Sequence, residues 1–166
     1  MSITTEELKR MISYDESTGI FRWIEKRRGR NYGGVAGSIH KTLGYLQVRI
    51  SYKLYYGHRL AWQYVHGYEP TERIDHIDGN PSNNMLSNLR MCSQSQNMGN
   101  SRKRSNNTSG FKGVSWFKRD GKWKVQIQCA GMKNKHIGYY DSPEIAAIVY
   151  DITALEMFGQ FAKTNF

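Results

Sequence analysis

The chain has 166 residues, enough for one ordinary domain or two small ones, and with 39% hydrophobic and 13% aromatic residues it has the composition of a folded protein. No apolar run approaches the length of a membrane span, the N-terminus lacks the layout of a secretion signal, and the two cysteines form no C-x-x-C pair. We therefore expect an intracellular protein with no membrane partner, no disulfide framework and no structural zinc site.

Basic residues are concentrated in one part of the chain, whose formal net charge is +10. Residues 99–135 contain ten Lys and Arg and a single acid, Asp120, whereas residues 141–166 contain four acids and one basic residue, Lys163. A merely solvated surface usually mixes both signs, so a one-signed segment predicts a polyanionic partner. The family resemblances given below imply that this partner is double-stranded DNA.

The N-terminal residues predict a short helix followed by a strand. Thr4 and Glu7 have the spacing of a capping box, and the helical spacing of apolar residues continues to Ile12. A turn at residues 14–19 then leads into a strand at residues 21–23.

The next segment predicts a strand pair and a second helix. After a basic loop at residues 25–30, apolar and polar residues alternate at 46–50, which predicts a half-buried strand with residues 51–56 as its partner. Residues 58–66 predict a helix that ends at Gly67. We expect this part to support packing and to contribute DNA contacts. The candidates are Arg27, Arg28, Arg30, Lys41 and Arg49, with His58 and Arg59 as phosphate contacts only.

Residues 73–99 predict a strand, a loop, a second strand and a helix. The first strand runs through Ile74 and His76, D-G-N-P is a turn sequence, and residues 89–92 form the returning strand. The helix begins after Ser93, which has a glutamine three residues later as in a capping box. This arrangement is expected to bring the end of the first strand against the first turns of the helix.

The polar residues of this unit suit phosphodiester hydrolysis. His76 is a candidate general base, because imidazole titrates near neutral pH. Asp75 and Asn97 are hard oxygen ligands for one divalent ion, Mg²⁺ or Mn²⁺, and Asn88 would fix the loop or the imidazole. Asp78 is an alternative ligand in place of Asp75, ranked second because it begins the turn and is expected to cap it.

The segments D-H-I-D-G-N, N-L-R and Q-N in this unit also carry a family resemblance. They resemble the HNH nuclease motif, in which His76, Asn88 and Asn97 stand at the three defining positions. The last position is often His, but phage and intron-encoded homing endonucleases use Asn there. The resemblance implies a ββα-metal fold and DNA cleavage, and the chain lacks the cysteine pairs of some HNH relatives.

Residues 99–110 are polar and basic, which predicts a linker. Its cluster of Arg102, Lys103 and Arg104 is expected to run along a DNA groove and to order on binding. A localisation-like basic cluster and a plain flexible tether remain open alternatives.

From residue 111 onward the sequence predicts three antiparallel strands and a helix. The strands are expected at residues 114–117, 123–129 and 135–140, with Trp123, Val125, Ile127 and Cys129 sharing the apolar face of the middle strand. The helix begins after Ser142, with Pro143 in its first turn, and ends at Gly159. Its predicted buried stripe consists of Ile145, Val149, Ile152 and either Leu155 or Met157.

This C-terminal part resembles the plant apetala-two, or ethylene-response-factor, DNA-binding domain. The resemblance rests on F-K-G-V, G-K-W, I-G-Y-Y-D-S, the A-A and Y-D pairs of the helix, and the terminal K-T-N-F. It implies that the exposed sheet face lies in the DNA major groove, with Gln126 and Gln128 at adenine edges and Lys112 and Lys124 at phosphates. Because several plant positions carry Arg, Glu or Trp instead, the plant sequence preference is not carried over.

Together these features predict an α+β protein. It would have an HNH nuclease domain at residues 1–98 with a ββα-metal core at about 73–99, a basic linker at 99–110, and an apetala-two-like domain at 111–166, in which a three-stranded antiparallel sheet packs on one helix. The predicted function is that of a homing-endonuclease-like, metal-dependent DNA endonuclease working as a monomer on DNA, in the cytoplasm of a bacterial host if phage-encoded. The alternative is a non-catalytic DNA-binding regulator with a degenerate finger.

The predicted site residues fall into three groups. The catalytic residues are His76 and Asn88, and the metal ligands are Asp75 and Asn97. The DNA-binding residues are Arg102, Lys103, Arg104, Lys112, Ser115, Lys124, Gln126, Gln128, Asn134 and His136.

Overall fold

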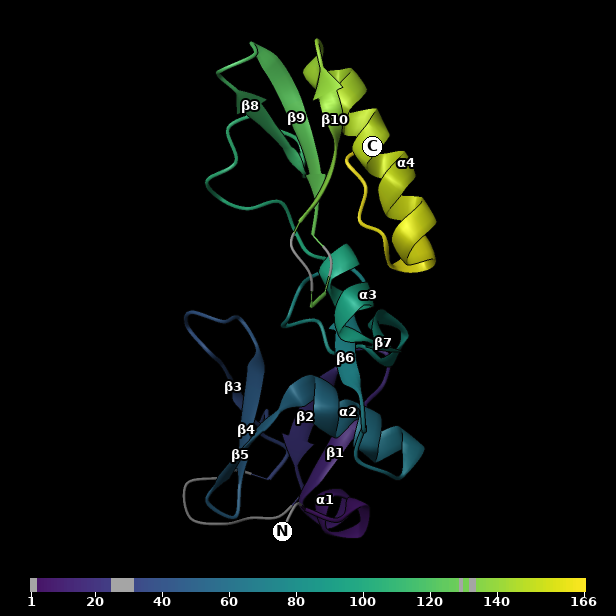
Figure 1. The fold of residues 1–166 in the computed structure, drawn as a ribbon. Helices are drawn as coiled ribbons and strands as arrows, with labels where there is room; N and C mark the ends of the chain where they lie inside the picture. The colour runs from purple at the N-terminus through teal and green to yellow at the C-terminus, as the bar shows by residue number, and fades with distance from the viewer. Residues whose placement is uncertain (1–2, 25–31, 129, 132–133) are drawn as a thin grey trace. The chain divides into compact units, whose positions relative to one another are not determined.

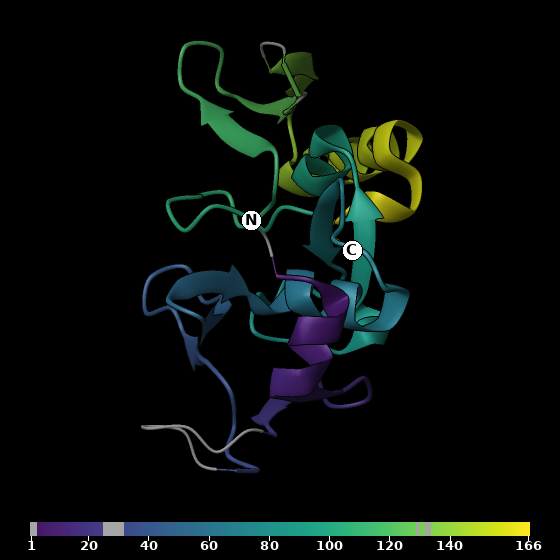
Figure 2. The same cartoon turned by 90° about the horizontal axis from the view of Figure 1, so that it is seen from below.

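The computed structural model of the chain describes residues 3–24, 32–128, 130–131 and 134–166. The fold is α+β and divides into two compact units, Met1–Met91 and Cys92–Phe166 (Figures 1 and 2). The predicted basic loop with Arg27, Arg28 and Arg30, and the predicted facing of Cys129, lie outside the described residues. No helix in the described part of the chain is long and apolar enough to cross a membrane.

The first unit begins with helix α1 (Thr5–Met11) and the hairpin of β1 (Ile12–Asp15) and β2 (Ile20–Trp23). The Thr4 hydroxyl accepts a hydrogen bond from Glu7 N, and the Glu7 carboxylate accepts one from Thr4 N, which confirms the predicted capping box. Ile12 was predicted to continue the helix, but its backbone is extended and it starts β1. Its side chain is fully buried, so the core holds it on the strand.

A three-stranded sheet and a helix complete the core of the first unit. Strands β3 (Ser38–Ile39), β4 (Leu46–Ile50) and β5 (Lys53–Tyr56) pair antiparallel, and helix α2 (Gly57–His66) follows. Gly67 ends α2 in the left-handed conformation with φ of 81°, as predicted. The core gathers large side chains from these elements and from the hairpin. They include Leu8, Ile12, Phe21, Val48, Ile50 and Leu60.

The predicted nuclease finger is present along the chain. Strands β6 (Arg73–His76) and β7 (Leu89–Cys92) form a two-stranded sheet, with the 3-10 turn η1 (Leu86–Asn88) just before β7. Helix α3 (Gln94–Gly99) follows, and the Ser93 hydroxyl accepts from Gln96 N as the capping box predicts.

The second unit contains the predicted sheet. Strands β8 (Val114–Phe117), β9 (Lys122–Ile127) and β10 (Lys135–Tyr140) lie in the order β10-β9-β8, all antiparallel (Figure 1). Val114, Val125 and Ile127 are buried in the core of this unit. Strand β9 ends at Ile127, so it is shorter than predicted and Gln128 lies just beyond it.

Helix α4 (Pro143–Phe158) packs on the sheet through a face that the sequence analysis did not predict. Its buried residues are Ala146, Ala147, Tyr150, Asp151, Ala154 and Phe158. The predicted buried stripe was wrong, because Ile145, Ile152 and Leu155 are 53%, 54% and 53% exposed and Met157 is 38% exposed. One reason lies at Gly113, where the missing side chain leaves room for the Tyr150 ring, so the helix side that carries Tyr150 and the alanines meets the sheet.

Helix α3 packs within the second unit, so the division of the chain by contacts falls after Met91. A Cβ at Gly99 would lie 2.6 Å from Phe158 Cγ, and Gly99 O accepts a hydrogen bond from Lys163 N, just after the 3-10 turn η2 (Gly159–Phe161). Cys92 is buried in the core of this unit. The functional domain bounds 1–98, 99–110 and 111–166 stay a prediction.

Candidate nuclease site and nucleic-acid interface

The loop after β6 is held by a closed set of hydrogen bonds around Asp78. Its Oδ1 accepts from Asn80 N (2.7 Å) and Asn88 Nδ2 (3.0 Å), its Oδ2 accepts from Asn83 Nδ2 (2.8 Å), and its backbone N donates to Asn88 Oδ1 (3.0 Å). Burial opposes ionisation of Asp78, but these hydrogen bonds outweigh it and lower its pKa. Asp78 therefore caps the turn, and the Asn88 side chain locks the loop.

His76 is buried at the end of β6, where only 5% of the residue is exposed. Its Nε2 lies 3.4 Å from Asn84 Oδ1, and the Asn84 amide is oriented by donating from Nδ2 to Ser82 O (3.0 Å). Because a carboxamide oxygen only accepts, this contact favours the tautomer with the proton on Nε2 and the lone pair on Nδ1. Tyr14 holds the same segment by donating from its hydroxyl to Asn84 O (2.7 Å).

The surroundings keep His76 neutral. Burial lowers the pKa of His76, while the Asn84 hydrogen bond and the carboxylates of Asp78 and Asp75 oppose that change. The net pKa lies below the usual value, so the imidazole is in its basic form at neutral pH.

A second histidine lies against His76. The His58 ring centroid is 5.2 Å from that of His76 and 5.3 Å from that of Tyr45, and the Tyr56 ring stacks on the His58 ring with centroids 5.6 Å apart. Burial first, then the charges of His76 and Arg59, lower the pKa of His58 to about 3. Its Nδ1 is buried and finds no hydrogen-bond partner in the part of the chain that the structure describes. His58 thus lies in a partly buried cluster of rings with Tyr45, Tyr56 and His76, and its phosphate contact stays a prediction.

Asp75 is buried and bound to an arginine. Its Oδ2 accepts from Arg90 Nε at 3.0 Å and lies 2.9 Å from Arg90 Nη2, and the two side chains are only 7% and 17% exposed. The Arg90 guanidinium on β7 thus neutralises the Asp75 carboxylate on β6, the strand that pairs with β7. Among the described residues no three His, Cys, Asp or Glu side chains gather as a metal site. Asn97 lies on α3 in the second unit, so its pairing with Asp75 stays a prediction.

Asn84 and Arg90 were missed by the sequence analysis. Asn84 is one of several asparagines in the loop, and nothing in the local pattern separates it from the turn-forming ones. Arg90 belongs to the N-L-R segment but was assigned no role there. A basic residue on the returning strand of a hairpin is nevertheless a natural partner for a carboxylate on the first strand.

The outer face of the sheet in the second unit carries polar and aromatic side chains together. Ser115, Lys124 and Tyr139 stand opposite one another across the three strands. The Phe117 and Tyr139 rings lie 5.1 Å apart, and the Lys124 ammonium is 5.8 Å from the centre of the Phe117 ring. The predicted groove-contacting residues of the sheet thus surround an aromatic patch that the sequence analysis did not single out.

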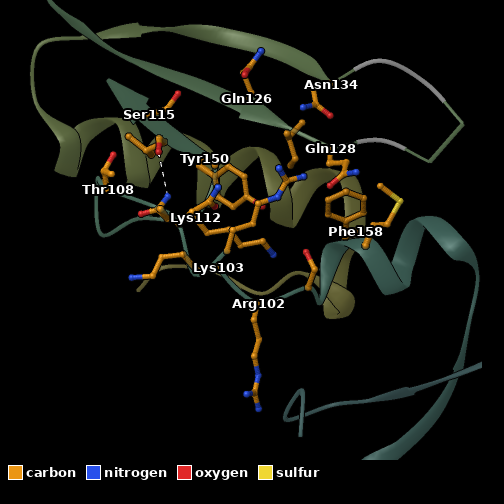
Figure 3. A pocket seen from close by; sticks show the side chains of 18 residues that line it. Arg102, Lys103, Thr108, Lys112, Ser115, Gln126, Gln128, Asn134, Tyr150 and Phe158 are labelled. Atoms are coloured by element: carbon orange, nitrogen blue, oxygen red, sulfur yellow. Dashed lines mark hydrogen bonds between the residues drawn. The ribbon is translucent and has the colours of Figure 1, made fainter. Parts of the chain in front are cut away.

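Most of the predicted DNA-binding residues line a single cavity of about 280 Å³ within the second unit (Figure 3). It lies between the segment after α3, the ends of β8 and β9, and two aromatic residues of α4. The predicted residues in its lining are Arg102, Lys103, Arg104, Lys112, Ser115, Gln126, Gln128 and Asn134.

Lys112 has a structural use beside its predicted phosphate contact. Its Nζ donates to Gly99 O (2.7 Å) and to Lys163 O (3.2 Å). Burial first, and then the charge of Lys163, lower the pKa of Lys112 to about 8, against the opposing effect of Asp151. Two of its three N–H donors are therefore used inside the protein.

The order of strand, locked loop, strand and capped helix, with Asp75, His76 and Asn88 at the predicted places, is that of a ββα-metal finger. The sequence pattern of the HNH endonuclease family matches residues 55–99. The chain belongs to this family.

Three known proteins are similar to the chain in sequence. Protein 3.8 of Escherichia phage T7 is 38% identical over 121 residues, 70% of this chain and 98% of the T7 protein. The uncharacterized HNH endonuclease L560 of Acanthamoeba polyphaga mimivirus is 35% identical over 92 residues, 55% of this chain but only 46% of the viral protein. The AP2-like ethylene-responsive transcription factor At1g16060 of Arabidopsis thaliana is 40% identical over 63 residues, 37% of this chain and 18% of the plant protein.

One solved structure also aligns with the chain. The HNH homing endonuclease I-HmuI, in a structure of DNA binding and cleavage, is 26% identical with a TM-score of 0.41, over 57% of this chain and 53% of that chain.

Proposed function

We propose that the protein is a metal-dependent DNA endonuclease that hydrolyses phosphodiester bonds, with the finger as its catalytic part and the second unit as its DNA-placing part. Membership of the HNH endonuclease family supports the nuclease. The observation that carries the proposal further is the environment of His76, a buried and neutral imidazole next to a buried carboxylate on the same strand.

His76 is the general base in this proposal. An imidazole that is neutral at pH 7 can take a proton from the attacking water, and the contact with Asn84 leaves Nδ1 as the accepting atom. The hydrogen bonds between Asn88 and Asp78 fix the loop that follows the histidine, so Asn88 positions the base and does not touch the substrate.

Asp75 and Asn97 are the residues that would hold the divalent ion. A carboxylate oxygen and a carboxamide oxygen are the hard donors that Mg²⁺ and Mn²⁺ prefer, and the Asp75 carboxylate lies 2.9 Å from Arg90 Nη2. When bound, such an ion stabilises the negative charge on the phosphate and on the leaving oxygen.

The second unit supplies the DNA affinity. Its sheet face carries the half-buried Lys124, its basic segment carries the exposed Arg102, Lys103 and Arg104, and an AP2-like plant protein matches 63 residues of the chain. Phosphate contacts from such residues bind all sequences alike, while the carboxamides of Gln126 and Gln128 suit base edges.

A plasmid assay tests the proposal. Supercoiled DNA with Mg²⁺ should be nicked or linearised by the native protein, and His76→Ala should slow cleavage by about 10²–10⁴-fold while DNA affinity is kept. His66→Ala is the matched control, because His66 lies exposed on α2. If the native protein binds DNA but leaves it uncut with Mg²⁺ and with Mn²⁺, the chain is a DNA-binding regulator with a degenerate finger.

A further inference from the structure

The cavity of the second unit has a one-signed electrostatic lining. Four cations, Arg102, Lys103, Arg104 and Lys112, border it, and none of the described residues that line it is acidic. The first three are exposed, so they bring positive charge to its outer side. Such a lining favours an anionic ligand over any neutral or cationic one.

The deeper wall of the cavity is apolar and aromatic. Tyr150 and Phe158 are buried, only 3% and 7% exposed, and both contribute to the lining. Figure 3 shows the Gln128 side chain beside Phe158, Lys112 beside Tyr150, and Arg102 extending away from this group. A ligand would therefore lie over the nearly buried rings, with the exposed carboxamides of Gln128 and Asn134 and the exposed cations along its outer side.

This combination fits a nucleotide better than a free phosphate. The volume of about 280 Å³ is close to the lower limit, roughly 300 Å³, of sites that enclose small organic ligands. Cations donate only, which suits a phosphate, whereas Gln128 and Asn134 both donate and accept, which suits the hydrogen-bonding edge of a base. Tyr150 and Phe158, only 3% and 7% exposed, close the floor of the cavity beneath such a ligand.

We infer that the cavity binds one unstacked nucleotide of the bound DNA, with its phosphate toward Arg102, Lys103 and Arg104 and its base toward Gln128 and Asn134. This inference rests on the proposed DNA binding by the second unit. A base inside a paired duplex does not expose its pairing edge, so occupation requires a nucleotide that has left the stack. The protein should therefore prefer DNA in which that unstacking is already present.

The test compares three DNAs bound by the full chain in EDTA at one fixed salt concentration. They are a paired duplex, the same duplex with a single-nucleotide bulge, and the same bulge without its base. The abasic bulge has similar backbone flexibility, so a preference for the first bulge reports contacts to the base. We expect the native protein to bind the bulge with a base about tenfold more tightly than the abasic bulge.

Gln128→Trp should abolish this preference by filling the cavity. Gln128 is exposed and lies just past β9, so the exchange leaves the core of the second unit intact. Because Gln128 is also a proposed contact to base edges, the readout is the ratio of the affinities for the two bulges, which a general loss of DNA affinity leaves unchanged. Gln160→Trp is the matched control, the same exchange at an exposed position outside the cavity lining. Gln128→Ala, which keeps the cavity open, should lower the preference to about threefold.

Each outcome of these binding measurements either supports or refutes the nucleotide site. Loss of the preference in Gln128→Trp and its retention in Gln160→Trp supports the site. Equal binding of both bulges by a native protein that binds the paired duplex refutes the nucleotide site and leaves DNA binding intact, and a preference that survives in Gln128→Trp refutes its location. If the native protein binds none of the three DNAs, the proposed function fails together with the site.

Discussion

Replacing Arg90 by alanine should destabilise the first unit strongly, because it leaves the Asp75 carboxylate buried without its partner. The two side chains are 7% and 17% exposed, and both Arg90 nitrogens lie within 3.0 Å of Asp75 Oδ2. Removing one member of a buried ion pair typically costs about 3–5 kcal/mol. Since Arg90 remains partly solvated, we expect a loss of about 3 kcal/mol in the free energy of unfolding.

Urea unfolding followed by tryptophan fluorescence, to which Trp23 and Trp62 of the first unit contribute, measures this loss. Exposed Arg73→Ala on β6 is the matched control and should change stability by less than about 0.5 kcal/mol. Adding Asp75→Asn to Arg90→Ala should restore more than half of the loss, because the unpaired charge disappears. If the two single effects simply add, the side chains are not coupled and the argument fails.

The same variants test the metal site apart from cleavage. If Asp75 is a metal ligand, a bound cation should compensate for the lost guanidinium, so Mg²⁺ at ten times its dissociation constant should stabilise Arg90→Ala by about 1.4 kcal/mol. The variant that also carries Asp75→Asn should not respond. An equal response of both variants would show that Mg²⁺ binds elsewhere.

Three further predictions concern pH, packing and DNA affinity. The pKa of His58 is near 3 in the folded chain and 6.5 when unfolded, so between these pH values only the unfolded state binds a proton at His58. The free energy of unfolding should therefore fall by about 2 kcal/mol from pH 7 to pH 5. His58→Phe should remove that loss in urea titrations. In chemical denaturation of the second unit, Ile152→Ala should cost less than about 1.5 kcal/mol, whereas Ala147→Leu should cost about 1–3 kcal/mol by overpacking, and the reverse order would contradict the burial seen for α4. Lys124→Ala should reduce the salt slope of DNA binding by about one while weakening all sequences alike, and an unchanged slope in a filter-binding titration would remove Lys124 from the phosphate contacts.

Local signals in the sequence predicted the elements of the finger well. The capping boxes at Thr4 and Ser93 and the turn at Asp78 depend on hydrogen bonds between residues a few positions apart, so they can be read without knowledge of the fold. The partners Asn84 and Arg90 depend on which strand faces which, and no local pattern contains that information. The roles of Asp75, His76, Asn88 and Asn97 in cleavage stay predictions.

The buried face of α4 shows where periodicity is insufficient. Apolar residues occupy most sides of this helix, so the spacing of the large ones at Ile145, Ile152 and Leu155 does not identify the side that meets the sheet. The sheet selects the side with Tyr150 and the alanines because Gly113 leaves room for the Tyr150 ring there.

The exposed side of α4 has a practical consequence for handling the protein. Ile145, Ile148, Ile152 and Leu155, each about half exposed, form an aliphatic ridge on an otherwise basic molecule. High concentrations of sulfate or phosphate, used to strip nucleic acid from basic proteins, strengthen contacts between such ridges. Preparations freed of DNA in this way should become less monodisperse as they are concentrated, and chaotropic anions or a glutamate at position 148 should reverse the trend.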